Sequence, residues 1–243
     1  MTPRITLAVA GRVLTQIRRD HRTLALLLVL PCLLITLLWW MFEDTPVFDQ
    51  VGPALLAMFP FIVMFLVTSV TTLRERSGGT LERLLAMPMG KLDFLVGYAL
   101  AFGAVAAVQA ALAVGLSVGV LGLDVQGPVW LLLVVAVVDA VLGTALGLFV
   151  SAFARTEFQA VQFMPAVVIP QILLCGLFIP RDQLPQALEW VSNVLPLSYA
   201  VDAMQTLAET AATTDVWRDL AVVAAYAVAG LALGAATLRR RTP

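Results

Sequence analysis

Six long runs of apolar residues alternate with shorter polar segments along the chain. Because a helix needs about 20 apolar residues to cross the hydrocarbon core of a bilayer, runs of this length predict membrane-spanning helices. The fifth run is short and is interrupted by Pro165 and Pro170, whereas the others are nearly continuous. We predict spans over residues 23–42, 53–73, 94–121, 129–153, 163–179 and 217–238.

The segment before the first run has the periodicity of an amphipathic helix. Over residues 4–20, Val13 and Ile17 share an apolar face and the arginines occupy the opposite face. A helix of this kind lies in the membrane interface, attracted to anionic lipid; packing on another domain is the alternative. The chain is thus divided into an interfacial helix, residues 1–22, and a transmembrane domain, residues 23–241.

A long polar segment before the last run also has helical spacing. Within residues 181–208, Leu184 and Leu188 begin one apolar stripe, and a second stripe follows the next proline. We predict two short outer helices that lie on the outer leaflet or re-enter it, with Trp190 and Tyr199 as interfacial anchors.

Composition and charge agree with this pattern. The chain of 243 residues is 60% hydrophobic and 13% charged, whereas soluble domains carry about 25% charged residues. Of the 15 lysines and arginines, 13 fall on one side of the six spans, and Arg181 and Arg218 fall on the other. The positive-inside rule makes the first side cytoplasmic. The sequence therefore predicts an all-α polytopic protein of the cytoplasmic membrane, with both termini in the cytoplasm.

The sequence contains few residues that could support catalysis. It has one histidine, His21, so an H-E-x-x-H metal site is excluded. It also lacks the G-x-x-x-x-G-K-[ST] loop that binds nucleotide phosphates. We predict no catalytic, metal or cofactor site in this chain, and no nucleic-acid partner.

Asp139 is the one ionisable residue deep within a predicted span. A carboxyl group at that depth costs about 2.5–3.5 kcal/mol on insertion scales, so it should face protein or a water-filled cavity. Asp139 and Gln171 could line a translocation path, and Asp139 could relay protons. A structural hydrogen bond from Asp139 to Gln109 or Gln171 is the alternative.

The longest polar interruption on the cytoplasmic side covers residues 74–89. Gly78 and Gly79 allow the chain to turn, Thr80 is a suitable N-cap, and Pro88 ends the next helix. This pattern predicts a short cytoplasmic helix over about residues 80–88, with a leucine face and a charged face, that docks a partner; an inert connector is the alternative. The predicted docking residues are Arg74, Glu75, Arg76, Thr80, Leu81, Glu82, Arg83, Leu84 and Leu85.

This segment also carries a resemblance to a known family. The run R-E-R-S-G-G-T-L-E-R-L-L-A-M-P resembles the segment after the second span in type-2 ABC transporter permeases, written E-R-E-x-G-T-L-E-x-L-x-x-x-P. The run G-L-F-I-P-R-D-Q-L-P-Q-A-L-E-W-V-S-N-V-L-P-L-S-Y-A-V-D-A resembles the exit of that family's fifth span and its outer helices. The two matches have the family's order and spacing, so the resemblance covers nearly the whole chain. The small size and the absence of a fused nucleotide-binding domain look most like the drug-resistance, daunorubicin-type exporters. The extra glycine at Gly79 departs from the family pattern.

The resemblance implies the function. It implies the membrane subunit of an ABC exporter that works as a homodimer with two separate ATP-binding subunits, which bind the ATP and contact the short cytoplasmic helix. The substrate would be a hydrophobic or amphipathic drug or lipid that passes at the interface of the two permeases. Two alternatives stay open: a non-transporting assembly subunit, and a carrier driven by an ion gradient that uses Asp139.

Overall fold

The computed structural model describes residues 3–43, 45–78 and 91–237, and all regular structure in those ranges is helical. Six of the described helices are long and apolar enough to cross a membrane, as the sequence predicts. These are α2 (His21–Met41), α3 (Val47–Ser77), α5 (Lys91–Gly119), α6 (Val129–Val150), α7 (Glu157–Leu174) and α10 (Thr214–Ala236). The all-helical, six-span fold class is therefore confirmed.

The bounds of α7 differ from the prediction of 163–179 because local capping decides them. The Thr156 side chain accepts a hydrogen bond from the Gln159 backbone N–H at 3.2 Å, which begins the helix at Glu157. The first turn of α7 contains polar residues, so a prediction based on apolar runs places the start of the helix too late. At the other end, Gly176 adopts a left-handed φ of 94°, which ends the helix after Leu174.

Close packing of α3 on α6 forms the centre of the bundle. A Cβ atom at Gly143 would lie 2.4 Å from the Phe61 carbonyl oxygen, and one at Gly147 would lie 2.5 Å from that of Phe65. Only glycine allows the two backbones to approach this closely. Gly230 of α10 faces the opposite side of α6, against Ala145.

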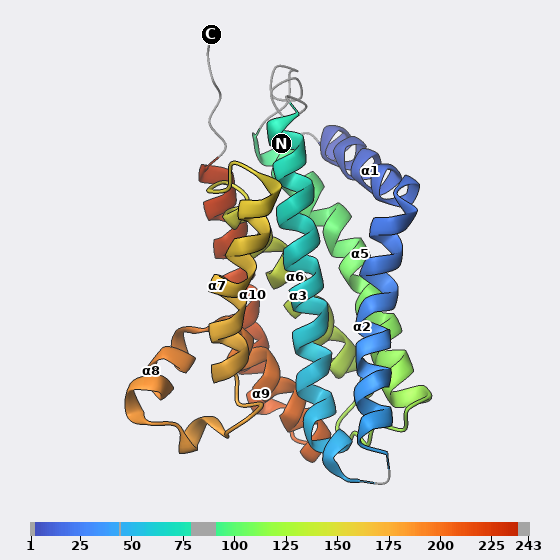
Figure 1. Ribbon diagram of the computed structural model, residues 1–243, viewed down its shortest axis with the longest axis vertical. Helices are drawn as coiled ribbons and strands as arrows, with labels where there is room; N and C mark the ends of the chain where they lie inside the picture. The colour runs from blue at the N-terminus through green and yellow to red at the C-terminus, as the bar shows by residue number, and fades with distance from the viewer. Residues whose placement is uncertain (1–2, 44, 79–90, 238–243) are drawn as a thin grey trace.

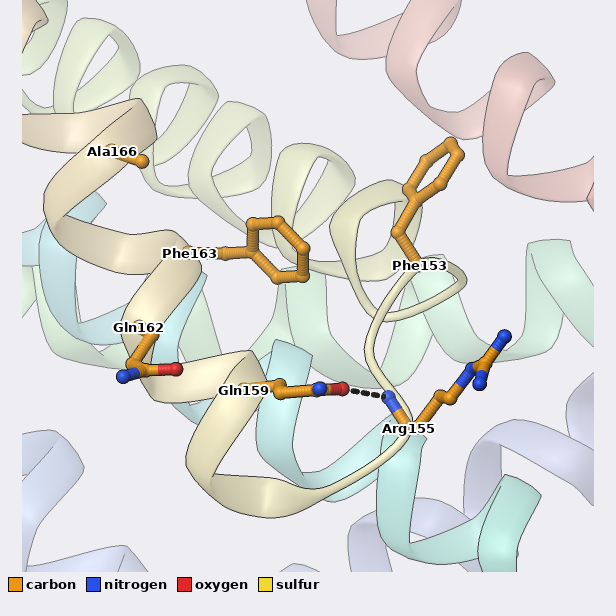
Figure 2. A pocket seen from close by; sticks show the side chains of 6 residues that line it. All are labelled: Phe153, Arg155, Gln159, Gln162, Phe163 and Ala166. Atoms are coloured by element: carbon orange, nitrogen blue, oxygen red, sulfur yellow. Dashed lines mark hydrogen bonds between the residues drawn. The ribbon is translucent and has the colours of Figure 1, made fainter.

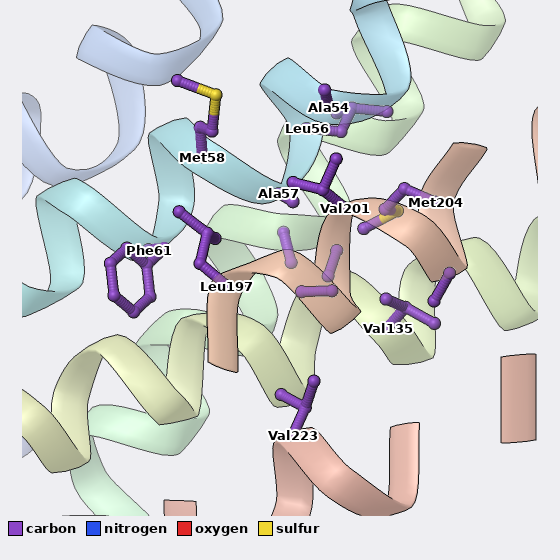
Figure 3. Packing of buried hydrophobic residues seen from close by; sticks show 14 of the residues in the cluster. Ala54, Leu56, Ala57, Met58, Phe61, Val135, Leu197, Val201, Met204 and Val223 are labelled. Atoms are coloured by element: carbon purple, nitrogen blue, oxygen red, sulfur yellow. The ribbon is translucent and has the colours of Figure 1, made fainter. Parts of the chain in front are cut away.

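The predicted outer pair consists of two helices with different surroundings. α9 (Pro196–Glu209) buries Leu197, Val201 and Met204 completely, and Figure 3 shows them beside Val135 of α6 and residues of α3. α8 (Gln186–Val194) follows a 3₁₀ turn, η1 (Arg181–Gln183), and leaves Trp190 69% exposed. Thus α9 belongs to the core of the bundle, and α8 lies outside it.

α1 (Pro3–Arg19) lies at the end of the bundle where α3 and α10 finish and α5 begins, whereas α8 and α9 lie at the opposite end (Figure 1). We call these the α1 end and the α9 end; the charge distribution predicts that the α1 end is cytoplasmic. The predicted amphipathic character of α1 is present, since Val9, Val13 and Ile17 are buried against the bundle.

Candidate coupling site and membrane interior

The candidate coupling site lies at the α1 end, where α3 finishes and α5 begins. The chain between them, residues 79–90, lies outside the described residues, and so does the predicted cytoplasmic helix over residues 80–88. Of the predicted docking residues, Thr80, Leu81, Glu82, Arg83, Leu84 and Leu85 are in that segment. The structure places Arg74, Glu75 and Arg76 in the last turn of α3.

Arg12 of α1 connects both helices that flank this segment. Its Nη2 atom lies 3.2 Å from Glu75 Oε1 of α3 and donates to the Tyr98 hydroxyl of α5 at 2.8 Å. The Glu75 and Tyr98 side chains are buried, with exposed fractions of 6% and 0%. Glu75 therefore faces α1 and the protein interior, and its carboxylate is satisfied within the chain by a charge-assisted hydrogen bond.

A second contact holds α1 against the start of α5. Thr6 Oγ1 donates to Asp93 Oδ1 at 3.1 Å, and both side chains are buried. One turn further along α5, a Cβ atom at Gly97 would lie 2.7 Å from the nearest Val9 methyl carbon, so α1 packs directly on the α5 backbone. These contacts connect α1 to the two helix ends between which the predicted coupling helix lies in the sequence.

Arg74 faces the opposite neighbour. Its guanidinium donates two hydrogen bonds to the Glu157 carboxylate of α7, at 2.8 and 2.9 Å. Both side chains are more than half exposed, so solvent screening leaves the pair little effect on stability. Its effect is geometric, because it joins the end of α3 to the first residue of α7.

Sequence reasoning identified Arg74 and Glu75 but missed their partners. The sequence pattern predicts Arg12 on the exposed face of an interfacial helix, and Glu157 falls between the predicted fourth and fifth spans. The available signal was Glu75 itself, because an acid at the end of an apolar run needs a cation or a donor if it is buried. The pairing itself depends on which helices are adjacent.

Asp139 lies in the centre of α6 with no exposed surface, and neither of its carboxylate oxygens has a hydrogen-bond partner among the described residues. The predicted amide partners are used elsewhere: Gln109 donates to the Leu27 carbonyl at 2.8 Å. Gln171 donates to Val167 at 3.1 Å and accepts from the Leu197 backbone N–H at 3.3 Å. Gln171 thus satisfies an N–H in the first turn of α9, which has no side-chain cap of its own.

At the α9 end, Arg181 joins η1 to the helices that follow. Its guanidinium bonds to the Asp202 carboxylate and the Asn193 side chain and lies 5.0 Å from the centre of the Tyr199 ring. Burial raises the pKa of the Asp202 carboxyl above its ordinary value, and Arg181 only partly offsets that rise. Tyr199, which the sequence predicts as an interfacial anchor, lies beneath Arg181 and donates to the Asn193 carbonyl at 2.7 Å.

The remaining outer residues differ in exposure. Leu184 follows η1, and Leu188 and Trp190 of α8 are 42% and 69% exposed. The Ser192 hydroxyl of α8 donates to the Leu174 carbonyl at 2.7 Å. α8 is therefore attached to the end of α7 by its polar side, and its apolar side faces outward.

Similarity to known proteins covers most of the chain. The profile of the ABC-2 type transporter family matches residues 5–207. The chain is 28% identical over 171 residues to the probable multidrug ABC transporter permease YbhR of Escherichia coli. This alignment covers 70% of this chain and 46% of that protein. It is 27% identical over 147 residues to the inner membrane transport permease YhhJ of Escherichia coli, covering 60% and 39%.

A protein of Dictyostelium discoideum is also similar to this chain. The chain is 27% identical over 159 residues to ABC transporter G family member 20 of Dictyostelium discoideum, covering 65% of this chain and 22% of that protein. In each of these relatives the alignment covers less than half of the protein. Because the family profile matches most of the chain and six described helices can cross a membrane, the chain is a multi-pass membrane protein that belongs to the ABC-2 type transporter family.

Proposed function

We propose that this chain is the membrane-spanning permease of an ATP-driven exporter, energised by a separate ATP-binding subunit that docks on residues 80–88. The observation that carries the proposal is the arrangement around Arg12. A single side chain contacts Glu75 before the docking segment and Tyr98 after it. Movement imposed on that segment would therefore act on α3, α5 and α1 together.

The proposed route into the membrane follows the packing of α3. Gly143 and Gly147 of α6 lie against the α3 backbone without intervening side chains, and tightly packed helices transmit displacement because the interior is nearly incompressible. Through the Arg74–Glu157 pair the same end of α3 also contacts α7. A force at the end of α3 would be transmitted to the centre of the bundle through the α3–α6 packing. It would be transmitted to α7, at the edge, through the Arg74–Glu157 pair.

We further propose that two copies of the permease work together and that the substrate is a hydrophobic or amphipathic molecule. α2 and α7 leave most of their apolar surface outside the fold, including Leu33 and Leu37 of α2 and Leu173 of α7. Lipid or a second copy would cover that surface. The name of the relative YbhR, a probable multidrug permease, supports a multidrug substrate range.

The decisive experiment is co-purification with an ATP-binding subunit. Leu84→Asp places a charge on the proposed leucine face, and Glu82→Lys reverses a charge beside it; both should abolish ATPase association while membrane insertion stays intact. Leu188→Asp, on exposed α8 at the opposite end, is the matched control and should leave association unchanged. Unchanged association of Leu84→Asp and Glu82→Lys would refute docking at this segment.

Asp139 supports a second candidate function, a carrier driven by an ion gradient. A buried carboxylate whose oxygens lack described partners is the kind of group that binds or relays a cation. Transport that persists without any ATP-binding subunit and that Asp139→Asn abolishes would favour this carrier. Transport that requires the ATPase and survives Asp139→Asn would exclude it.

A further inference from the structure

A cavity of about 470 Å³ opens on the side of α7 at the α1 end of the bundle. It lies between the first three turns of α7 and the connector from α6. This volume is in the range of sites for small molecules, about 300–1,000 Å³. The cavity is lined by Phe153, Arg155, Gln159, Gln162, Phe163 and Ala166.

The lining separates into an apolar side and a polar side. Figure 2 shows the Phe153 and Phe163 rings on one side and the side chains of Arg155 and Gln159 on the other. An amphipathic molecule has the same division between an apolar body and a polar head. A purely apolar ligand would leave the polar side unused, and a purely polar one would leave two rings uncovered.

The polar side is built from hydrogen-bond donors and contains no carboxylate. Gln159 Oε1 accepts from the Arg155 backbone N–H at 2.8 Å, which leaves the Gln159 amide NH₂ group to donate. Among the described residues, the Arg155 guanidinium has no ion-pair partner, although Arg74 at the same end is paired with Glu157 at 2.8 Å. A guanidinium cation in the lining of a cavity that also holds an amide donor selects for an anionic head such as phosphate or carboxylate.

The outer face of α7 continues this separation along the membrane. Ala166, Ile169 and Leu173 follow Gln162 at helical spacing, and Ile169 and Leu173 are 46% and 56% exposed. An alkyl chain whose head lies at Arg155 would therefore lie along an apolar strip that runs toward the α9 end. The strip and the cavity belong to one continuous helix face.

We propose that this cavity is the entry site for an anionic amphiphile from the leaflet at the α1 end. Arg155 and the Gln159 amide bind the anionic head, and the two phenylalanine rings contact the beginning of the chain. The inference rests on the proposed function in that the bound amphiphile would be the substrate that the exporter moves. It adds a chemical class, because the permease would prefer anionic over cationic amphiphiles.

The test measures binding to the full chain in nanodiscs of phosphatidylcholine, without an ATP-binding subunit. The probes are three fluorescent amphiphiles with the same alkyl chain and a phosphate, a glucoside or a trimethylammonium head. Wild-type protein should bind the phosphate probe most tightly. Arg155→Gln should weaken binding of the phosphate probe about tenfold, equivalent to 1.4 kcal/mol, and leave binding of the glucoside probe unchanged. Arg155→Lys should retain most of the preference.

Two further variants control the test. Phe163→Ala should weaken all three probes, because it removes contact with the shared chain. Arg19→Gln removes an exposed arginine from α1 at the same end and should change nothing. Equal binding of the phosphate probe by wild type and Arg155→Gln would overturn the proposal, as would an equal loss for all three heads or no effect of Phe163→Ala. Because no ATPase is present, a failure of ATP-dependent transport would count against the proposed function and leave this site intact.

Discussion

One glycine in α6 and one in α5 provide the sharpest test of the packing, because the same substitution should have different effects at the two sites. We consider Gly143→Ala in α6 and Gly115→Ala in α5. Both glycines lie inside long helices, so both variants gain the same helix propensity, about 1 kcal/mol. Only their surroundings differ: a Cβ atom at Gly115 has nothing within 4 Å, whereas one at Gly143 meets the Phe61 backbone.

The distances set the expected magnitude. At Gly143 the new carbon would lie 2.4 Å from the Phe61 carbonyl oxygen, 3.1 Å from its carbonyl carbon and 3.2 Å from its Cα atom. These atoms belong to the α3 backbone, so α6 must move away and lose contact along the whole crossing. Overpacking typically costs about 1–3 kcal/mol. We therefore expect Gly115→Ala to be neutral or stabilising. The free energy of unfolding of Gly143→Ala should be lower than that of Gly115→Ala by about 1–3 kcal/mol.

The assay is thermal unfolding of both purified variants and of wild type in one detergent, followed by loss of monodisperse protein. Comparing two alanines in one protein removes the shared detergent and propensity effects. A Gly143→Ala variant as stable as Gly115→Ala would show that α3 and α6 do not pack directly by backbone contact. A large loss for Gly115→Ala would show that the outer face of α5 is covered.

Three other predictions concern the helix ends. Arg12→Gln leaves Glu75 buried without its cation and should lower the free energy of unfolding by about 1–3 kcal/mol. Adding Glu75→Gln to this variant should restore part of the lost stability. Hydrogen bonds from Thr23 lower the pKa of Asp20, which caps α2; the roughly 1 kcal/mol lost in Asp20→Ala at neutral pH should shrink on acidification. Gly176→Ala should cost about 1–2 kcal/mol because of its φ of 94°.

Each of these has a measurement that can contradict it. For Arg12, the unfolding temperature of the double variant must be higher than that of Arg12→Gln. A lower unfolding temperature in the double variant would exclude charge pairing between Arg12 and Glu75. For Asp20, a lowered folded-state pKa means that the stabilisation is present above the ordinary pKa of 3.8 and is lost as the pH falls through the folded value. An Asp20→Ala deficit that does not shrink as the pH falls below 3.8 would be inconsistent with a cap that depends on the ionised carboxylate. For Gly176, equal stability of Gly176→Ala and the control Gly11→Ala, in open space on α1, would contradict a left-handed requirement.

Periodicity and charge predicted the fold class because bilayer physics leaves few choices. A run of about 20 apolar residues must form a helix in hydrocarbon, where backbone groups can bond only within the chain. The element bounds were less accurate where polar residues lie at a helix end. α3 reaches from Val47 to Ser77 although its apolar core is shorter, and α7 begins at Glu157 because Thr156 caps it.

The candidate site was predictable only in part. The segment around Arg74 was identified by its motif, but the partners of its charges come from distant positions: Arg12 lies 63 residues from Glu75, and Glu157 lies 83 residues from Arg74. The outer helices show the same limit. The stripe containing Leu197 and Val201 indicated an amphipathic helix, and only the packing shows that its apolar side faces α3 and α6.

The sequence by itself determined the number of spans, the amphipathic helix at the start and the family motif, because each depends on the local order of apolar and polar residues. The tertiary structure decided which helices touch, and therefore the roles of residues whose partners are remote. It placed Gly143 against Phe61, Glu75 beside Arg12, and Asp139 where no described donor reaches it. Helix neighbours are selected by shape across the whole bundle, and local periodicity carries no information about them.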